Sequence, residues 1–212
     1  MKPALCLLLL LAPWLPARTW TDVRGRTVEG ELMRVEAGNP IVSLNDPKTC
    51  LAQGWMCVAF DSNTGFPGST CAINEGMALL TKEWPVLKTS DYAVGGFSGG
   101  VVACCLPCAW LVKNEYRVIG AFIGGNNADY FDTERKRMQA PREPYRRIKV
   151  LVSSGQLDKN ASPEGATAMP KSLKSSGLGE VRLRTHEGGH KFYEPHFDEA
   201  LTWFVETGEK KK

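Results

Sequence analysis

Long apolar runs, charge of one sign and phosphate-loop motifs are scarce in this 212-residue sequence, and each shortage excludes a class of protein. The apolar run at 4–12 is too short to span a bilayer, which takes about 20 apolar residues. The formal net charge of +3 gives no electrostatic footprint for binding nucleic acid. No Gly-Lys-Ser or Gly-Lys-Thr follows the Gly-rich turn at 95–100, so a phosphate-cradling loop would lack its cation and hydroxyl.

The amino terminus has the pattern of a secretory signal peptide. Lys2 supplies a positive start, the leucine-rich run at 4–12 follows, and Pro-Trp-Leu-Pro-Ala at 13–17 breaks it. A buried helix is the weaker interpretation, because so uniform a run has no polar face. We expect cleavage after Ala17 and a secreted or periplasmic protein. Without Lys2, the 26 basic residues become 25 against 23 acidic ones, a net charge of +2.

Six of the seven cysteines remain once Cys6 is removed with this segment. An even number in an exported chain permits disulfides, but six cysteines have fifteen possible pairings. Cys104 and Cys108 lie four apart, on one face if the stretch is helical. A metal site would need two more ligands nearby, and none is evident. We therefore expect buried thiols that pack as small apolar residues, and neither a metal nor an organic cofactor.

The sequence pattern of residues 18–46 differs from that of the rest of the chain and predicts a small antiparallel β unit. Short, partly alternating runs lie between turn signals at Gly25 and at 38–40. Trp-Thr-Asp at 20–22, Gly-Arg-Thr at 25–27 and Glu-Gly-Glu-Leu at 29–32 resemble the first half of a Sla-type homology domain, a small SH3-like barrel. That resemblance implies protein contact as the role of this segment, whereas the residues themselves indicate only a β hairpin.

Strands and helices alternate along the second predicted domain, residues 50–207. Pro107 lies inside one predicted helix and should kink or shorten it. The stretch at 129–138 is mostly polar, without a clear apolar period. The alternation predicts an α/β fold: a reduced, mostly parallel sheet with helices on both faces, plus the small N-terminal β hairpin. The predicted strands are 55–60, 92–94, 117–123, 148–152 and 181–183, and the predicted helices are 75–82 (capped by Asn74), 101–112, 163–176 and 197–206.

Ser98 lies in Gly-Phe-Ser-Gly-Gly at 96–100, between a predicted strand and a predicted helix. A sharp strand-to-helix turn exposes the hydroxyl at the edge of a sheet, and small neighbours allow the backbone to turn tightly. The pentapeptide alone is weak support, since an ordinary Gly-rich turn has the same composition. Its position between strand and helix makes Ser98 a candidate nucleophile.

Residues 54–206 resemble the latter part of an α/β hydrolase, through the segment at 92–100 and Gly-Ala-Phe-Ile-Gly-Gly at 120–125. The nearest group is that of secreted esterases similar to dienelactone hydrolases and polyester depolymerases, here truncated on the N-terminal side. The resemblance implies an acid after a later strand, which matches Asp158 in Gly-Gln-Leu-Asp at 155–158. It implies a base after the final strand, which matches His190 in Glu-Gly-Gly-His at 187–190.

The order Ser98, Asp158, His190 is the hydrolase order of nucleophile, acid and base. His190 would take the proton of Ser98, and Asp158 would orient the imidazole and stabilise its charged form. The backbone N–H of Gly99 would supply one oxyanion donor. Nothing at 45–53 resembles the loop that supplies a second donor, and only their position suggests the residues at 62–63 as substitutes. The predicted reaction is hydrolysis of a small-molecule or polymer ester.

Two other interpretations remain. His-Glu-Gly-Gly-His at 186–190 matches the zinc-protease motif, with His196 where a third ligand would lie. That chemistry needs a helix, and two adjacent glycines within one cost about 1 kcal/mol each relative to alanine. Tyr193 replaces the turn glycine of such proteases, and no methionine follows His196. The other interpretation is a non-catalytic, hydrolase-like interaction protein with an incomplete oxyanion hole.

Overall fold

The structure is a computed structural model. It describes residues 68–206 with the exception of residue 84, together with the backbone of four short strands at 6–11, 18–21, 27–30 and 55–60. In the range 68–206, only the backbone is described for residues 68, 69, 72, 83 and 86.

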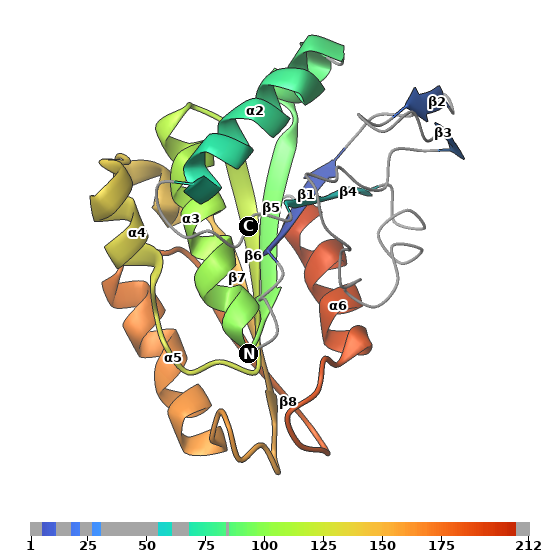
Figure 1. The fold of residues 1–212 in the computed structure, drawn as a ribbon. Coiled ribbons are helices and arrows are strands. Elements are labelled where there is room, and N and C mark those ends of the chain that lie inside the picture. Colours follow the sequence, from blue (N-terminus) through green and yellow to red (C-terminus); the bar gives the residue numbers. More distant parts are fainter. Residues whose placement is uncertain are drawn as a thin grey trace, which may run out of the picture.

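A parallel sheet of four strands forms the centre of the molecule (Figure 1). Its neighbours are joined in chain order, each to the next, so every connection crosses over the sheet in the same direction. These strands are β5 (Asp91–Phe97), β6 (Arg117–Gly124), β7 (Lys149–Gly155) and β8 (Val181–His186). β5, β6 and β8 cover their predicted ranges and β7 begins one residue late, and all four extend beyond the prediction toward the carboxyl end.

Both faces of the sheet are buried at β6 and β7, where consecutive residues lie in the interior whichever way they point. In β7, Val150 and Val152 belong to one hydrophobic core, whereas Leu151 between them belongs to the other. The same alternation places Ala121 and Phe122 of β6 in opposite cores. The predicted α/β fold, with helices on both faces, is confirmed.

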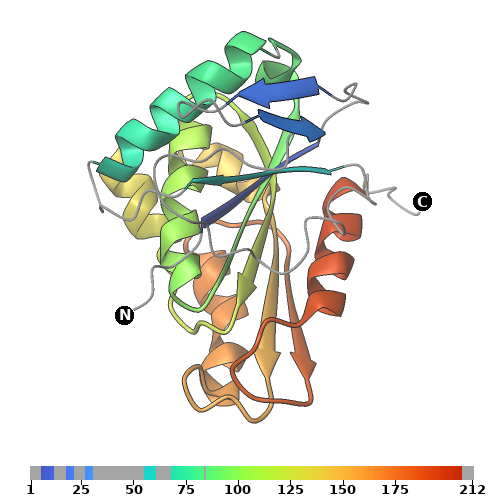
Figure 2. The ribbon, with the colours of Figure 1, turned by 45° about the vertical axis from the view of Figure 1, so that its right-hand side comes forward.

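Helices form a layer on each side of the sheet (Figures 1 and 2). Those whose residues line the larger core are α2 (Gly68–Glu83), α3 (Gly99–Lys113), α4 (Phe131–Met138) and α5 (Pro163–Ser175). The opposite face is covered by α6 (Glu194–Val205). Two 3-10 turns, η1 (Pro85–Thr89) and η2 (Glu143–Arg147), precede β5 and β7. Within the described part of the chain, no helix has the length and apolar character needed to cross a membrane.

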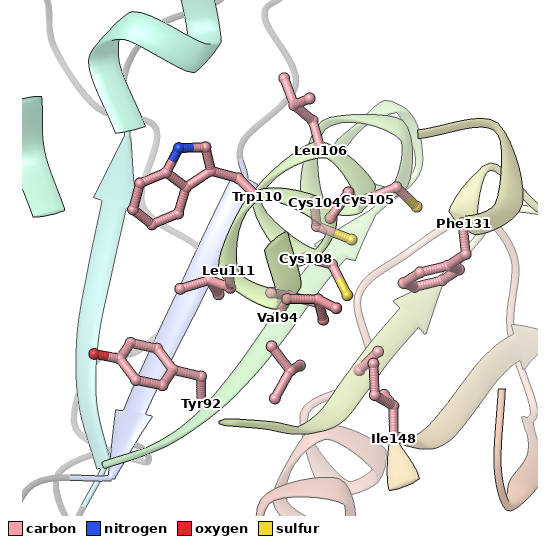
Figure 3. Packing of buried hydrophobic residues seen from close by; sticks show 14 of the residues in the cluster. Tyr92, Val94, Cys104, Cys105, Leu106, Cys108, Trp110, Leu111, Phe131 and Ile148 are labelled. Carbon is pink, nitrogen blue, oxygen red and sulfur yellow. The ribbon is translucent and has the colours of Figure 1, made fainter. Parts of the chain in front are cut away.

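The most deeply buried helix is α3, and Pro107 lies inside it without ending it. Of the expectation that Pro107 kinks or shortens the helix, the shortening is wrong, because packing against β5, β6 and α4 outweighs the lost hydrogen bond, and the kink stays a prediction. Cys104, Cys105 and Cys108 are buried in this helix as free thiols, among the apolar side chains shown in Figure 3. Burial raises the pKa of Cys105 and of Cys108, so these thiols stay protonated and pack as small apolar residues.

Two helices differ from the sequence prediction. α2 begins at Gly68, so Asn74 is not its cap; instead, Asn74 Oδ1 accepts a hydrogen bond from Trp110 Nε1 at 2.6 Å. α4 occupies the polar stretch in which no helix was expected. It buries Phe131, Glu134 and Met138, at a spacing that a helix places on one side. Because one of these three buried residues is the charged residue Glu134, the sequence shows no clear apolar period there.

The N-terminal strands lie outside the parallel part of the sheet. β1 (Cys6–Leu11) lies between β4 (Trp55–Phe60) and β5, antiparallel to both. The predicted signal peptide therefore contains a strand of the sheet, and its cleavage stays a prediction. β2 (Arg18–Thr21) and β3 (Thr27–Gly30) pair antiparallel within the predicted β unit at 18–46. The rest of that unit, on which the SH3-like resemblance depends, lies outside the described residues.

Candidate active site

The loops that carry the candidate residues gather at one edge of the sheet. β5, β6, β7 and β8 run parallel, so their carboxyl ends meet at that edge, where the arrowheads point in Figure 2. Ser98 follows β5, Asp158 lies just after β7, and His190 follows β8. In an open α/β sheet this edge is where ligands bind.

Ser98 occupies a strained backbone conformation at the junction of β5 and α3. Its φ of 55° and ψ of −122° lie in a region that residues with a side chain rarely adopt, at a cost of about 1–3 kcal/mol. The turn is tight: a Cβ on Gly96 would lie 2.2 Å from the carbonyl oxygen of Gly100. The Ser98 N–H donates to the Gly124 carbonyl at 2.7 Å, which joins the turn to the end of β6.

Asn126 holds the other side of this turn and was not identified from the sequence. Its Nδ2 donates to the Ser98 carbonyl at 2.9 Å, and that carbonyl also accepts the N–H of Val101 at 3.1 Å. Its Oδ1 accepts the N–H of Ala128 at 2.8 Å, which fixes the orientation of the amide. Together with the Gly124 contact, these bonds over-determine the strained turn. In the sequence, the position was visible only as part of a turn that ends a strand.

Asp158 and His190 are brought into direct contact although 32 residues separate them in sequence. Nδ1 of His190 lies 2.8 Å from Oδ2 of Asp158. The other carboxylate oxygen accepts the backbone N–H groups of Asn160 at 2.8 Å and Ala161 at 2.9 Å. With Nδ1 committed to the carboxylate, Nε2 is the ring nitrogen of His190 available to a reacting group.

The carboxylate of Asp158 is buried and remains ionised. Burial alone would raise its pKa, but the N–H of Ala161, the ring of His190 and the N–H of Asn160 together hold the pKa below the ordinary value. A buried carboxylate of this kind favours the charged form of an imidazole bonded to it.

His190 lies beside the turn that carries Ser98. Its ring is 4.9 Å, between centroids, from that of Phe97, the residue before Ser98. Its Cε1 is 3.1 Å from the place that a Cβ on Gly125 would take, and Gly125 follows the carbonyl that accepts the Ser98 N–H. Gly99 is the first residue of α3, so its N–H has no carbonyl partner within the helix. The suggested oxyanion residues at 62–63 lie outside the described residues.

The histidines of the zinc motif are not arranged for a metal. His186 is the last residue of β8 and the segment after it is a bend, so the helix that the motif requires is absent. His196 lies in α6, where its Nδ1 is 2.9 Å from Oγ of Ser153. Among the residues that the structure describes, no group of three or more His, Cys, Asp or Glu could hold a metal ion. The zinc-protease interpretation is therefore wrong, because the motif requires a helix that this segment does not form.

Comparisons with known proteins find similarity of structure only. No protein-family model matches the sequence, and no curated protein matches it. The chain is similar to a Bacillus cereus carboxylesterase (18% identity, TM-score 0.41), over 64% of this chain and 58% of that one. It is also similar to Zea mays acyl-protein thioesterase 2 (18%, 0.47, over 74% and 75%) and to the Pyrococcus furiosus esterase Pf2001 (13%, 0.46, over 74% and 72%). The chain thus spans less than two thirds of the Bacillus enzyme, and the likeness concerns the fold.

Proposed function

We propose that this protein is a serine hydrolase that cleaves carboxylic esters through Ser98. In this proposal His190 is the general base, and the carboxylate of Asp158 orients His190. The observation that carries the proposal is the 2.8 Å contact between Asp158 and His190, at the sheet edge where Ser98 occupies its strained turn. A buried carboxylate, an oriented imidazole and an accessible hydroxyl are the groups that acyl transfer to serine requires, and Ser98 is partly exposed.

The proposed reaction proceeds through an acyl-enzyme. Oγ of Ser98 attacks the ester carbonyl while Nε2 of His190 accepts the hydroxyl proton, and the carbonyl π electrons move onto oxygen. Collapse of the tetrahedral intermediate breaks the bond to the alkoxy group, which leaves as the alcohol with the proton from His190. Water then adds to the acyl group in the same way, which releases the acid and restores Ser98.

Stabilisation of the oxyanion begins at the amino end of α3. The N–H of Gly99 follows the nucleophile directly, and the helix adds the positive end of its dipole. Loss of one oxyanion donor typically reduces the rate about 100- to 1,000-fold, so a site with Gly99 alone would be slow.

Export and substrate class are part of the same proposal. The leader-like run at 4–12 supports a secreted or periplasmic site of action. An ester of a small molecule or a polymer is the proposed substrate, and the β unit at 18–46 is the proposed surface for protein contact. The proposed chemistry uses only side chains and backbone N–H groups of this chain.

A fluorophosphonate probe tests the nucleophile, and a short-chain nitrophenyl ester tests turnover. We expect labelling of the wild-type protein, loss of labelling in Ser98→Ala, and ester hydrolysis that a chelator leaves unchanged. Ser154→Ala is the matched control, since Ser154 lies buried in β7 and is not a candidate nucleophile.

Two other outcomes would each exclude the proposal. Absence of both labelling and hydrolysis in a folded protein would favour the non-catalytic interaction protein. Labelling that persists in Ser98→Ala would assign the nucleophile to another residue.

A further inference from the structure

Three aromatic rings close the base of the loop that carries His190. This loop, residues 187–192, leaves the sheet at His186, the last residue of β8, and enters α6 at Tyr193, its N-cap. The rings of His186 and Tyr193 stack on one another, with 4.5 Å between centroids and 11° between planes. The two ends of the loop are therefore held together by side chains rather than by backbone pairing.

His196, in the first turn of α6, adds a third ring and a connection to the sheet. Its ring meets that of Tyr193 edge-on at 4.6 Å and lies 5.7 Å from that of His186. Its Nδ1 is 2.9 Å from Oγ of Ser153 in β7, and both residues are buried. The cluster thus ties the loop to β7, β8 and α6 at once.

Other contacts hold the end of the loop near α6, where the ring of Phe192 packs against those of Phe122 and Phe197. The segment before it is rich in glycine. Gly188 and Gly189 precede His190. Gly188 has a φ of 147°, a conformation that residues with a side chain rarely adopt. The N–H of Leu157 donates to the Gly188 carbonyl at 2.8 Å, and Asp158 holds the ring of His190. Those contacts act at the tip of the loop, whereas the ring cluster acts where the loop meets the sheet and α6.

Two of the three histidines in the sequence therefore have no place in the proposed reaction and yet lie buried beneath the one that does. Burying two imidazoles has a free-energy cost unless their polar atoms and faces find partners. The partners found here are one another, Tyr193, Ser153 and the Glu187 carbonyl, which lies 3.5 Å from Nδ1 of His186.

We infer that His186, Tyr193 and His196 form a positioning cluster, which sets the place of His190 relative to Asp158 and Ser98. The effect on catalysis rests on the proposed function, but the effect on the contact between Asp158 and His190 does not. Stacking requires flat rings at 186 and 193, so phenylalanine preserves the cluster at either position and alanine removes it.

The proton NMR signal of the Nδ1–H group of His190 measures directly whether the contact between His190 and Asp158 is kept. A proton held between imidazole and carboxylate gives a resolvable downfield signal in proton NMR, which His190→Gln would identify by its loss. We expect that signal in the wild type, His186→Phe and Tyr193→Phe. In His186→Ala and Tyr193→Ala we expect it to be lost or broadened, while thermal unfolding remains cooperative.

The labelling rate of Ser98 gives the second measurement. A displacement of about 1 Å at a catalytic group reduces rates about a hundredfold, so we expect a loss of this order in the alanine variants and recovery in the phenylalanine variants. Folded alanine variants with an unchanged signal and unchanged labelling would overturn the inference.

Two further results remain decisive. If an alanine variant does not fold, Tyr193→Leu keeps apolar volume without a ring, and an intact signal in that variant would also overturn the inference. An NMR response as expected in a protein that never labels would support the cluster and exclude the proposed hydrolase.

Discussion

At the residue scale, the strained turn at Ser98 depends on neighbours that are far away in sequence. The Gly124 carbonyl accepts its N–H, and the Asn126 amide donates to its carbonyl. A nucleophile held in this way keeps its hydroxyl in one place, and such orientation of the reacting group lowers the entropic part of the barrier.

Asn126→Ala should slow fluorophosphonate labelling of Ser98. The variant removes one hydrogen bond, worth about 0.5–1.5 kcal/mol, so we expect a reduction of about three- to tenfold. Asn126→Asp should be slower still, because its carboxylate would face the Ser98 carbonyl. Asn160→Ala is the control, since only the backbone N–H of that residue contacts the site. Equal labelling rates in all four proteins would contradict the role of Asn126.

Asp158→Asn should reduce ester hydrolysis far more than it reduces stability. The amide oxygen of the variant can still accept the backbone N–H groups of Asn160 and Ala161, but the variant loses the charge that favours the imidazolium, a change worth about 10,000-fold in a serine protease. Steady-state hydrolysis beside a urea unfolding curve separates the two effects. A loss of less than about tenfold in a folded variant would show that Asp158 is not the acid.

At the element scale, the loop that carries His190 joins β8 to α6. The packing of α6 against the sheet therefore sets the position of one end of that loop. Gly120 of β6 lies under the ring of Phe204 in α6, so closely that a Cβ would be 2.3 Å from it. A Cβ on Gly95 of β5 would meet the same layer at ordinary contact distances, 3.5 Å from Cβ of Phe122 and 3.9 Å from Cε2 of Phe197 in α6. These two glycines form a matched pair for testing the layer.

Gly120→Ala should destabilise the protein by about 1–3 kcal/mol, because overpacking displaces α6. Gly95→Ala should change the free energy of unfolding by less, since the methyl group meets ordinary contact distances. Urea unfolding measures both. Equal effects of the two substitutions would contradict the packing described for α6.

The contact between α6 and β7 should also make stability depend on pH. Burial and the neighbouring His186 lower the pKa of His196, with Arg184 acting in the same direction and Glu199 opposing it. In the unfolded chain the pKa is near 6.5, so acidification through that value protonates the unfolded state first and reduces stability. We expect the free energy of unfolding to fall between about pH 7.5 and 5.5, and to fall less steeply in His196→Gln. Parallel curves for the two proteins would exclude this origin.

At the scale of the whole molecule, the leucine-rich run has two incompatible descriptions. As a leader it is removed during export, whereas as β1 it lies between β4 and β5 and pairs with Tyr92–Gly95 of β5 through residues 7–10. We expect export to remove residues 1–17, leaving Arg18 as the first residue. Intact mass and N-terminal sequencing of the exported protein measure this. A full-length exported chain would instead make β1 a permanent strand.

Elements whose pattern depends only on local residues were predictable. β6 and α5 lie close to their predicted bounds, since an apolar run and a Ser-Pro helix start with Ser162 as N-cap are local signals. The seven-residue error at the start of α2 and the absence of a prediction for α4 have a common cause. Asn74 finds its partner in Trp110, and Glu134 is buried by its neighbours, and neither contact is visible in a local pattern.

The sequence by itself determined the order of the candidate residues and their places at strand ends, because apolar periodicity and turn residues are local properties. The contact of Asp158 with His190 was expected from that order, and its role with Ser98 stays a prediction. Only the tertiary structure decided that Asn126 holds the nucleophile turn and that the rings of His186, Tyr193 and His196 pack together at the base of the His190 loop. These contacts join residues on separate strands and α6, and parallel pairing of whole strands is what brings them to one edge.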